Sequence, residues 1–434
     1  MNSEYARNTF SRQRLADALV LQKRELAQRL AESYVPRLLH APAWEQDNLI
    51  RVILGPRRAG KSFFAIHWMK QFGEFAYLNL DDEALAGLSD FNAVLPVLNE
   101  IYPGTRNLLV DEIQNLSKWE LVANRLQRQG YRLTLTGSNA HLLSRELATH
   151  LTGRHVPMVV FPFSFAEYLQ TLGPMPTGAE AQSHAAVHAQ SGGYPEPLLR
   201  KLDAHNYLIT LLRAILYKDI VQRFQLRHPQ GLDNMAMYLF ANIASEYSLT
   251  RLTEIAQSRS VHTVEKYFRA MEEAFLLFSV PRFSWKVREQ ARSNKKVYAI
   301  DNGMAIAAGF RFTANLGRLY ENLVAIELHR QELEGRHRLY FWKNLQQEEV
   351  DFVIHKGTRV EQLIQVCADT GAERTGQREV RALLKGSREL RCNRLLILTE
   401  SEERRETAAW MDLRGEIEYQ PLWKWLADAG RARS

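Results

Sequence analysis

A glycine-rich octapeptide sets the strongest constraint on what this chain can fold into. It has the spacing G-x-x-x-x-G-K-S, directly follows the apolar run 49–54 and precedes the helix-like run 62–68. A buried strand, such a loop and a helix N-terminus bring backbone N–H groups together on an anion. The sequence therefore predicts a phosphate-binding loop. In it, Lys61 would reach the outer phosphates and Ser62 would ligate Mg²⁺. The predicted nucleotide-binding residues are Gly55, Pro56, Arg57, Arg58, Ala59, Gly60, Lys61 and Ser62.

A second apolar run, 107–110, ends in two carboxylates, Asp111 and Glu112, which is the Walker B pattern. Asp111 would hold the hydration shell of the Mg²⁺ ion, while Glu112 would orient and polarise the attacking water. Either motif alone can be an ordinary turn or a solvated strand end. Because both occur, we expect hydrolysis of a nucleoside triphosphate such as ATP, and not binding alone.

Around these motifs the chain alternates apolar runs with helical patterns. Further strands are expected at 75–80, 132–136 and 156–160, and further helices at 91–101 and 119–128. Repeated strand and helix units predict a parallel sheet covered by helices on both faces. The ligand should then lie at the carboxyl ends of the strands.

Three more residues are candidates for catalysis. Ser138 and Asn139 follow the strand at 132–136, so one of them could hydrogen-bond the attacking water or the γ-phosphate; a polar turn without ligand contact is the alternative. Arg154 is a candidate arginine finger, acting in cis or from a neighbouring subunit of a homo-oligomer. An ordinary surface arginine fits the sequence equally well.

Residues 231–305 read as three short helices followed by a strand pair rich in lysine and arginine, the plan of a winged helix. Its third helix would enter a DNA major groove, and its basic wing would contact phosphates. Acids on or near that helix, Glu265, Glu272 and Glu273, favour the alternative of a protein-docking module.

The last third has the layout of a restriction-endonuclease-like core. Glu321 lies on a helix, Asp351 near a strand start, and Gln365 and Cys367 occupy the next strand where a glutamate and a lysine are expected. Glutamine is a weaker, neutral metal ligand, and a thiol cannot replace an ammonium group. We therefore expect a degenerate domain without nuclease activity.

Charge and cysteine content narrow the partners. Lysine and arginine (56) exceed aspartate and glutamate (49), giving a net charge of +7, which favours a polyanion such as DNA, although solubility alone would also explain it. The two cysteines, Cys367 and Cys392, have no metal-binding spacing, so neither zinc nor a disulfide is expected. With no leader pattern and no long apolar run, we expect a cytoplasmic protein without a membrane partner.

Taken together, these motifs resemble a prokaryotic family of AAA-type P-loop ATPases that carry a carboxyl-terminal domain of uncharacterised function. The resemblance covers nearly the whole chain and implies ATP binding, a winged helix and a nuclease-like terminal fold. Besides the glycine-rich loop, the motifs that carry it are Asp111-Glu112-Ile113-Gln114, Thr136-Gly137-Ser138, Leu151-Thr152-Gly153-Arg154, Pro162-Phe163-Ser164-Phe165, Gly192-Gly193-Tyr194-Pro195, Lys218-Asp219-Ile220, Ile300-Asp301-Asn302-Gly303, Glu349-Val350-Asp351 and Gln365-Val366-Cys367.

The sequence thus predicts a Mg²⁺-dependent ATPase whose nucleotide state moves a winged helix and a nuclease-like domain on DNA. The rival hypothesis is a nucleotide-gated signalling or protein-docking switch that binds no nucleic acid. The expected regions are an amphipathic helical lead (1–48), the ATPase core (49–170), a helical lid (171–230), the winged helix (231–305) and the restriction-endonuclease-like domain (306–434).

Overall fold

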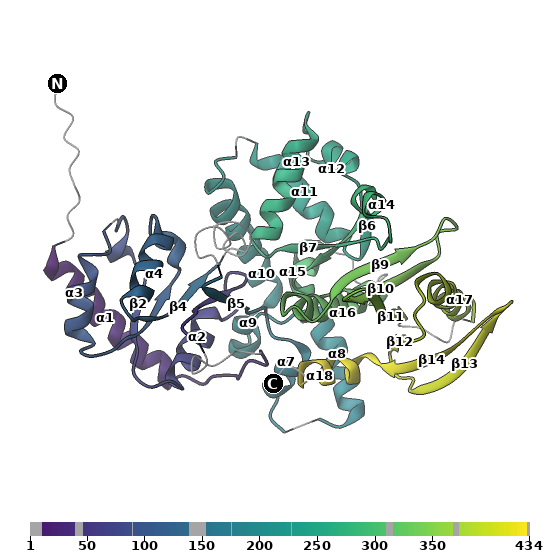
Figure 1. The fold of residues 1–434 in the computed structure, drawn as a ribbon, viewed down its shortest axis with the longest axis horizontal. Coiled ribbons are helices and arrows are strands. Elements are labelled where there is room, and N and C mark those ends of the chain that lie inside the picture. The colour runs from purple at the N-terminus through teal and green to yellow at the C-terminus, as the bar shows by residue number, and fades with distance from the viewer. Residues whose placement is uncertain are drawn as a thin grey trace. The chain divides into compact units, whose positions relative to one another are not determined.

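The computed structural model describes residues 11–39, 47–88, 90–138, 153–174, 176–226, 228–309, 316–367 and 373–431. They form two compact units, Met1–Val160 and Phe161–Ser434 (Figure 1). The candidate residue Asn139 lies outside the described residues. None of the helices in the described ranges combines the length and hydrophobicity that a membrane span requires.

A five-stranded parallel sheet forms the centre of the first unit, in the order β2-β3-β4-β1-β5. Its strands are β1 (Ile50–Leu54), β2 (Ala76–Asn79), β3 (Asn107–Asp111), β4 (Arg132–Gly137) and β5 (His155–Val159). Strand β1 is buried along its whole length, which is why it is apolar apart from Arg51, whose buried guanidinium pairs with Asp47. The expected P-loop α/β sheet is therefore confirmed.

Helices cover this sheet, and the leading helix belongs to the same unit. The helices are α1 (Arg12–Ala31), α2 (Lys61–Lys70), α3 (Val94–Ile101) and α4 (Trp119–Arg128), with the 3-10 helices η2 (Glu83–Leu85) and η3 (Ile113–Asn115). Leu26 of α1 shares a hydrophobic cluster with Ile53 and Phe64. The Gln22 side chain exchanges hydrogen bonds of 2.9 and 3.1 Å with the backbone of Asn79, so α1 shields the edge strand β2.

The second unit begins with helices. They are α7 (Phe165–Gln170), α8 (Gly178–Ser191), α9 (Pro195–Arg200), α10 (Ala204–Ala214) and a π-helix (Ile215–Gln222). Both α7 and α8 start with a capping box, in which a threonine or serine and a glutamate satisfy each other's backbone N–H groups. Helix α10 continues directly into the π-helix, whose turns are wider.

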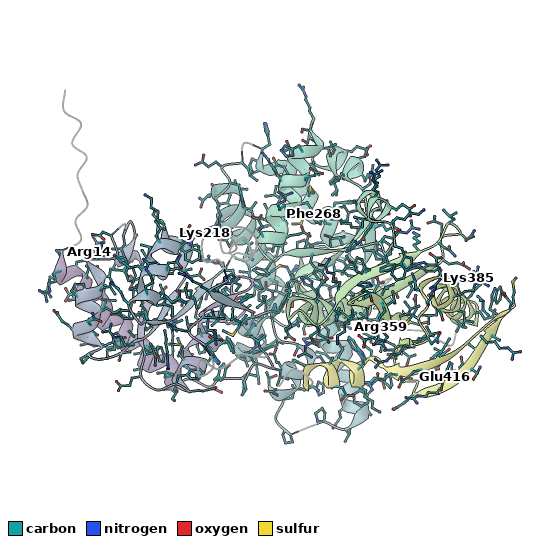
Figure 2. All side chains as sticks on the ribbon, viewed as in Figure 1. Arg14, Lys218, Phe268, Arg359, Lys385 and Glu416 are labelled. Atoms are coloured by element: carbon teal, nitrogen blue, oxygen red, sulfur yellow. The ribbon has the colours of Figure 1, made fainter. Side chains whose placement is uncertain are left out.

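Further helices and a small antiparallel sheet follow. The elements are α11 (Pro229–Ala241), β6 (Ser245–Tyr247), α12 (Leu249–Ile255), α13 (Val261–Glu273), β7 (Leu277–Pro281), α14 (Val287–Arg292), β8 (Lys295–Ala299) and α15 (Asn302–Ala307). The strand order is β6-β8-β7. Phe268 of α13 (labelled in Figure 2) stacks on Tyr247 of β6, with ring centroids 4.6 Å apart, and joins the helices to the sheet.

The chain ends in a mixed six-stranded sheet of order β13-β14-β12-β11-β10-β9. Its elements are α16 (Leu316–Leu333), β9 (Arg338–Lys343), β10 (Glu349–Lys356), β11 (Arg359–Cys367), α17 (Glu373–Leu390), β12 (Leu395–Thr399), β13 (Arg404–Trp410), β14 (Leu413–Pro421) and α18 (Leu422–Arg431). Leu363 of β11 shares a cluster with Leu383 of α17, whereas Ile364 lines a cavity with Leu328 of α16 and Trp425 of α18. Helices therefore cover both faces of this sheet.

Candidate functional site

The loop between β1 and α2 has the backbone of a phosphate cradle. Gly55 and Gly60 have φ angles of +146° and +92°, which L side chains rarely adopt. A Cβ atom at Gly55 would lie 2.0 Å from the carbonyl oxygen of Val160, so no larger residue fits there. Gly60 is the N-cap residue of α2, and the N–H groups of the first helical turn therefore border the loop.

Lys61 lies inside this loop, with only 4% of its surface exposed. Its ammonium group donates a hydrogen bond of 3.0 Å to the carbonyl oxygen of Pro56. Arg57 is 3.8 Å from the carboxylate of Asp81. The guanidinium of Arg37 donates a 2.9 Å hydrogen bond to the carbonyl oxygen of Ala59. Sequence reasoning missed Arg37, because no motif marks it and only the fold brings it to the loop.

Asp111 and Ser62 meet directly, as expected for a metal pair. The Ser62 hydroxyl donates a 2.9 Å hydrogen bond to the Asp111 carboxylate, which also accepts bonds from the Tyr77 hydroxyl (3.1 Å) and the Thr136 hydroxyl. Burial raises the pKa of Asp111 above its usual range, although the bonds from Thr136 and Ser62 oppose the shift. Carboxylate and hydroxyl oxygens are the ligand types that Mg²⁺ prefers, so the residues fit this ion.

Glu112 follows Asp111 in the left-handed region, with φ 54°, and is held from two sides. Its N–H donates a 3.0 Å hydrogen bond to the Thr136 hydroxyl. The Gln114 amide donates to the Glu112 carboxylate and also lies 3.4 Å from the Ser138 hydroxyl. The structure thus brings Glu112 and Ser138 together through Gln114. That residue had no assigned role, although it closes the motif Asp-Glu-Ile-Gln.

The structure does not bring Arg154 to the phosphate loop of its own chain. Its carbonyl oxygen accepts a 2.9 Å hydrogen bond from Ile50, the first residue of β1, whereas the loop follows Leu54, the last. Four residue steps along a strand span about 13 Å. Arg154 therefore lies at the amino-terminal end of β1, whereas the phosphate loop lies at its carboxyl end. The structure therefore does not place Arg154 at the loop of its own chain, and its role as an arginine finger remains a prediction.

Two of the sequence motifs turn out to be structural within the second unit. The carboxylate of Asp301 accepts hydrogen bonds from the N–H groups of Gly193 (2.7 Å) and Met304 (2.9 Å). A Cβ at Gly192 would lie 2.3 Å from an Asp301 oxygen. The motifs Gly-Gly-Tyr-Pro and Asp-Asn-Gly therefore pack against each other, which explains both glycines without a ligand.

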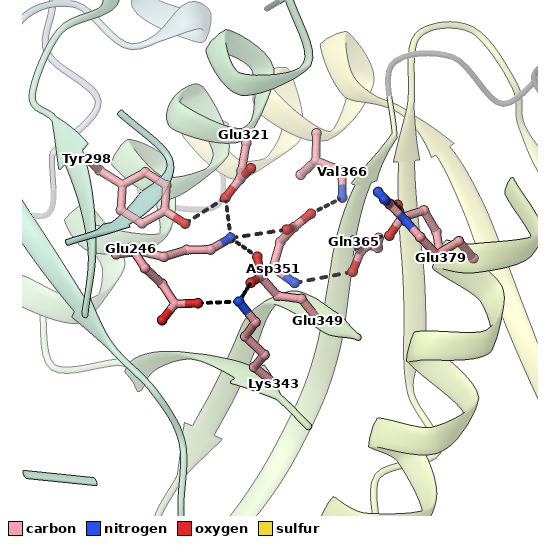
Figure 3. A network of polar contacts seen from close by, with 11 residues as sticks. Glu246, Tyr298, Glu321, Lys343, Glu349, Asp351, Gln365, Val366 and Glu379 are labelled. Carbon is pink, nitrogen blue, oxygen red and sulfur yellow. Dashed lines mark hydrogen bonds and ion pairs between the residues drawn. The ribbon is translucent and has the colours of Figure 1, made fainter. Parts of the chain in front are cut away.

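A second group of acids lies between β10 and α16 in the second unit (Figure 3). We call Glu321, Glu349 and Asp351 the acidic cluster. Figure 3 shows these three side chains gathered beside Tyr298. Lys296 of β8 ends among them: its ammonium is 2.8 Å from Glu321, 3.4 Å from Asp351 and also pairs with Glu349.

Only some of the residues expected to form a nuclease-like site lie at the acidic cluster. Asp351 accepts a 3.0 Å bond from the N–H of Val366, and its own N–H donates to the side-chain oxygen of Gln365 at 3.2 Å. The Gln365 amide in turn donates to Glu379. Cys367 belongs instead to the hydrophobic cluster under α17. Of the two unusual residues, only Gln365 therefore reaches the acidic cluster.

Burial and mutual repulsion shape the charges in the acidic cluster. Burial, with the Glu321 charge next, raises the pKa of Asp351 well above its usual range. Burial lowers the pKa of Lys296, but the carboxylates, Glu321 first, raise it by more, and the net shift is upward. Lys296 is therefore a charged ammonium at neutral pH.

Comparison with known proteins covers most of the chain. Residues 47–169 match a family described as an AAA domain, and residues 185–316 and 316–413 match two domains of unknown function, DUF8612 and DUF4143. The chain is 32% identical over 399 residues to an uncharacterised protein of Methanocaldococcus jannaschii, covering 87% of this chain and 88% of the relative. A protein of Haemophilus influenzae is 26% identical over 348 residues, covering 76% and 84%. Among solved structures, a Walker-type ATPase of Pyrococcus abyssi aligns with 70% of this chain and 97% of its own, at 13% identity and a TM-score of 0.40.

Proposed function

The chain belongs to the family of the Methanocaldococcus jannaschii protein and itself matches an AAA domain, and we propose that it is a Mg²⁺-dependent ATPase acting on DNA. The observation that carries the ATPase activity is the direct contact of Ser62 with Asp111, next to Glu112 and the glycine-rich loop. The effector parts would be a lid (171–230), a winged helix (231–305) and a restriction-endonuclease-like domain (306–434), after the helical lead (1–48) and the ATPase core (49–170).

Each residue of the nucleotide site has a role that its position supports. The loop and the first turn of α2 would bind the phosphates, and Lys61 would exchange the carbonyl oxygen of Pro56 for a phosphate oxygen. A bound Mg²⁺ ion, held by Ser62 and Asp111, would neutralise phosphate charge. Glu112 would orient and polarise the attacking water, while Gln114 fixes the direction of its carboxylate.

Through its contact with Gln114, Ser138 would couple the presence of the γ-phosphate to the position of the Glu112 carboxylate. Arg154, at the far edge of the sheet, could act only on the nucleotide of a neighbouring subunit, which would require a homo-oligomer.

The arrangement of 229–299 supports DNA binding by a winged helix. Helices α11, α12 and α13 precede β7, and β8 returns between β6 and β7. The α13 helix exposes Lys266 and Arg269, whereas Glu272, expected to oppose DNA, turns away and accepts a 2.8 Å hydrogen bond from Ser279. The segment between β7 and β8, which we call the wing (residues 282–294), exposes Arg288 and Arg292. Its charge suits phosphate contacts.

One observation favours the rival function, a nucleotide-gated docking switch for a protein partner. The wing also exposes Trp285 (56%) and Val287 (78%). Tryptophan is enriched in the energetic centre of protein interfaces. The two functions therefore differ in whether the wing binds phosphate or an apolar patch.

ATP hydrolysis by the purified protein, with and without single-stranded and duplex DNA at low and moderate salt, tests the proposal. We expect Mg²⁺-dependent turnover that DNA stimulates and that Glu112→Gln abolishes. No turnover would overturn the ATPase function. Turnover without stimulation, together with no DNA binding at low salt, would favour the docking switch.

The double variant Arg288→Glu, Arg292→Glu tests the wing itself. If both arginines contact phosphates, DNA affinity should fall at least roughly tenfold. The negative slope of log K, the DNA association constant, against log salt concentration should also become shallower by about 2. The control, Arg128→Glu with Arg132→Glu, makes the same charge change on exposed residues of the first unit. Equal losses in both variants would show that only net charge matters.

A further inference from the structure

The acidic cluster already holds a cation that belongs to the protein. Lys296 is 2% exposed and comes from β8, whereas Glu321 lies on α16, and Glu349 and Asp351 lie on β10. The ammonium contacts all three carboxylates, and the Tyr298 hydroxyl donates a further 2.8 Å hydrogen bond to Glu321. The cation thus comes from the small sheet, and the acids come from a helix and a strand of the terminal domain.

Two other cations near the cluster, Lys343 and Arg378, pair with acids outside it. Lys343 of β9 pairs with Glu246 of β6 and lies 3.6 Å from Glu349. Arg378 pairs with Glu379 at 2.7 Å. Among the ion pairs between described residues, Lys296 is therefore the only cation that reaches both Glu321 and Asp351.

Electrostatics explains why a cation is needed at this point. Three carboxylates with little exposure cannot all ionise side by side unless a positive charge lies between them, because desolvation and repulsion both oppose it. In a metal-dependent nuclease a divalent ion fills such a place and activates water through an open coordination position. An ammonium group offers charge and hydrogen bonds but no such position.

We propose that Lys296 is the resident cation of the acidic cluster, occupying the place that a divalent metal ion would otherwise take among Glu321, Glu349 and Asp351. In this position it fastens β8 of the small sheet to α16 and β10 of the terminal domain. Metal-assisted cleavage at this cluster is then blocked by the chain itself. The proposal does not depend on whether the first unit hydrolyses ATP.

A second link supports the fastening. The N–H of Phe283 donates a 2.7 Å hydrogen bond to the carbonyl oxygen of Phe341 on β9, and the Arg282 side chain reaches the carbonyl oxygen of Lys343. Lys343 contacts β6 in the opposite direction, from the terminal sheet to the small one. Two lysines pointing opposite ways thus join the two sheets, and Lys296 is the buried one.

Binding of Mn²⁺ without nucleotide, measured by electron paramagnetic resonance, tests the proposal. All proteins carry Asp111→Asn to remove the metal pair of the first unit. With Lys296 present we expect no tight site, whereas Lys296→Met should bind one Mn²⁺ per chain at least roughly tenfold more tightly. Adding Asp351→Asn should remove this site. A tight Mn²⁺ site with Lys296 in place that Asp351→Asn removes, or no site in the Lys296→Met protein, would overturn the proposal.

Thermal unfolding provides the second measurement. Lys296→Met should lower the Tm by roughly 10 °C, and Mn²⁺ should recover part of the loss. The control Lys385→Met removes a lysine that pairs with the buried Glu348, where Arg381 remains as a partner. Lys385→Met should lower the Tm by less than Lys296→Met does, and it should create no Mn²⁺ site. An equal loss in the control without any Mn²⁺ response of Lys296→Met would count against a resident cation.

If Lys296→Met does not fold, Lys296→Met with Glu321→Gln removes one charge of each sign and leaves two carboxylates. This protein should fold and bind Mn²⁺ through Glu349 and Asp351. A folded double variant without Mn²⁺ binding would contradict the proposal as well.

Discussion

Two buried aspartates, Asp111 in the first unit and Asp351 in the second, face the same problem of a desolvated charge and have different partners. Asp111 is surrounded by three hydroxyls, from Ser62, Tyr77 and Thr136, while the nearby Lys61 donates to a backbone carbonyl instead. Asp351 has the ammonium of Lys296 at 3.4 Å.

The two sites therefore differ in whether their cation can be exchanged. Hydroxyl groups carry no full positive charge, so the site of Asp111 gains most from an ion that arrives with its ligand. The acidic cluster contains its cation in the covalent chain, where it cannot diffuse away. We infer that the first site is suited to turnover and the second to holding two sheets together.

Glu112→Gln should have the largest effect. Because the amide cannot polarise water, turnover should fall at least roughly 100-fold while ATP affinity stays close to that of the wild type. Steady-state hydrolysis and binding of a fluorescent ATP analogue measure the two quantities. As a contrast, Lys61→Ala should weaken binding. Unchanged hydrolysis in Glu112→Gln would show that its role is misassigned.

The matched pair Asp111→Asn and Asp351→Asn tests the comparison directly. The first should lower Mg²⁺-dependent turnover by roughly 10- to 100-fold, because it weakens the metal pair. The second should leave turnover unchanged, since Lys296 and not a solvent ion compensates that acid. Hydrolysis rates over a Mg²⁺ titration give both results. Equal losses of turnover in the two variants would contradict the proposed difference between the two sites.

His188 should give the smallest effect, and it extends the comparison to a buried group that stays neutral. Burial, with the Arg330 charge next, lowers the pKa of His188 to about 3, and the ring stays neutral against Tyr168. Because the folded pKa lies below the unfolded value, stability is present above pH 6.5 and is lost as the pH falls. Between pH 6.5 and 5 the loss should be about 2 kcal/mol.

Denaturant unfolding of His188→Leu across this pH range measures the effect, because the variant lacks the His188 contribution. Asp301, whose pKa burial raises to about 6, contributes a loss of stability as the pH rises between 3.8 and 6. Its contribution cancels when the two proteins are compared. His184→Leu on the same helix should keep the wild-type slope, and parallel curves for wild type and His188→Leu would refute the assignment.

Much of the nucleotide site could be predicted from sequence, since its parts are short and contiguous. The loop from Gly55 to Ser62 and the pair Asp111-Glu112 contain their own strand ends, and parallel strands end at one edge of a sheet. The placement of Arg154 could not be predicted in the same way. It lies beside an equally local motif, but the pairing of β5 with β1 puts it at the other edge.

The partners of the acidic cluster show the same limit more strongly. Gln365 could be recognised as unusual from its position on a strand, but no pattern connects Lys296 to an aspartate 55 positions away. Nothing in the sequence distinguishes one basic residue of the segment 286–296 from another. Among them only Lys296 is buried, because β8 is buried from Lys296 onward and packs against α16.

By itself, the sequence determined that this chain forms a parallel P-loop sheet with a phosphate loop and an acid pair, because these depend on hydrogen bonds and hydrophobic patterns within a few residues. Which polar groups meet depends on the fold: Gln114 meets Ser138, Arg37 meets the loop, and Lys296 meets the acidic cluster. These contacts join segments far apart in the chain. Their energies depend on burial, which a linear sequence does not specify.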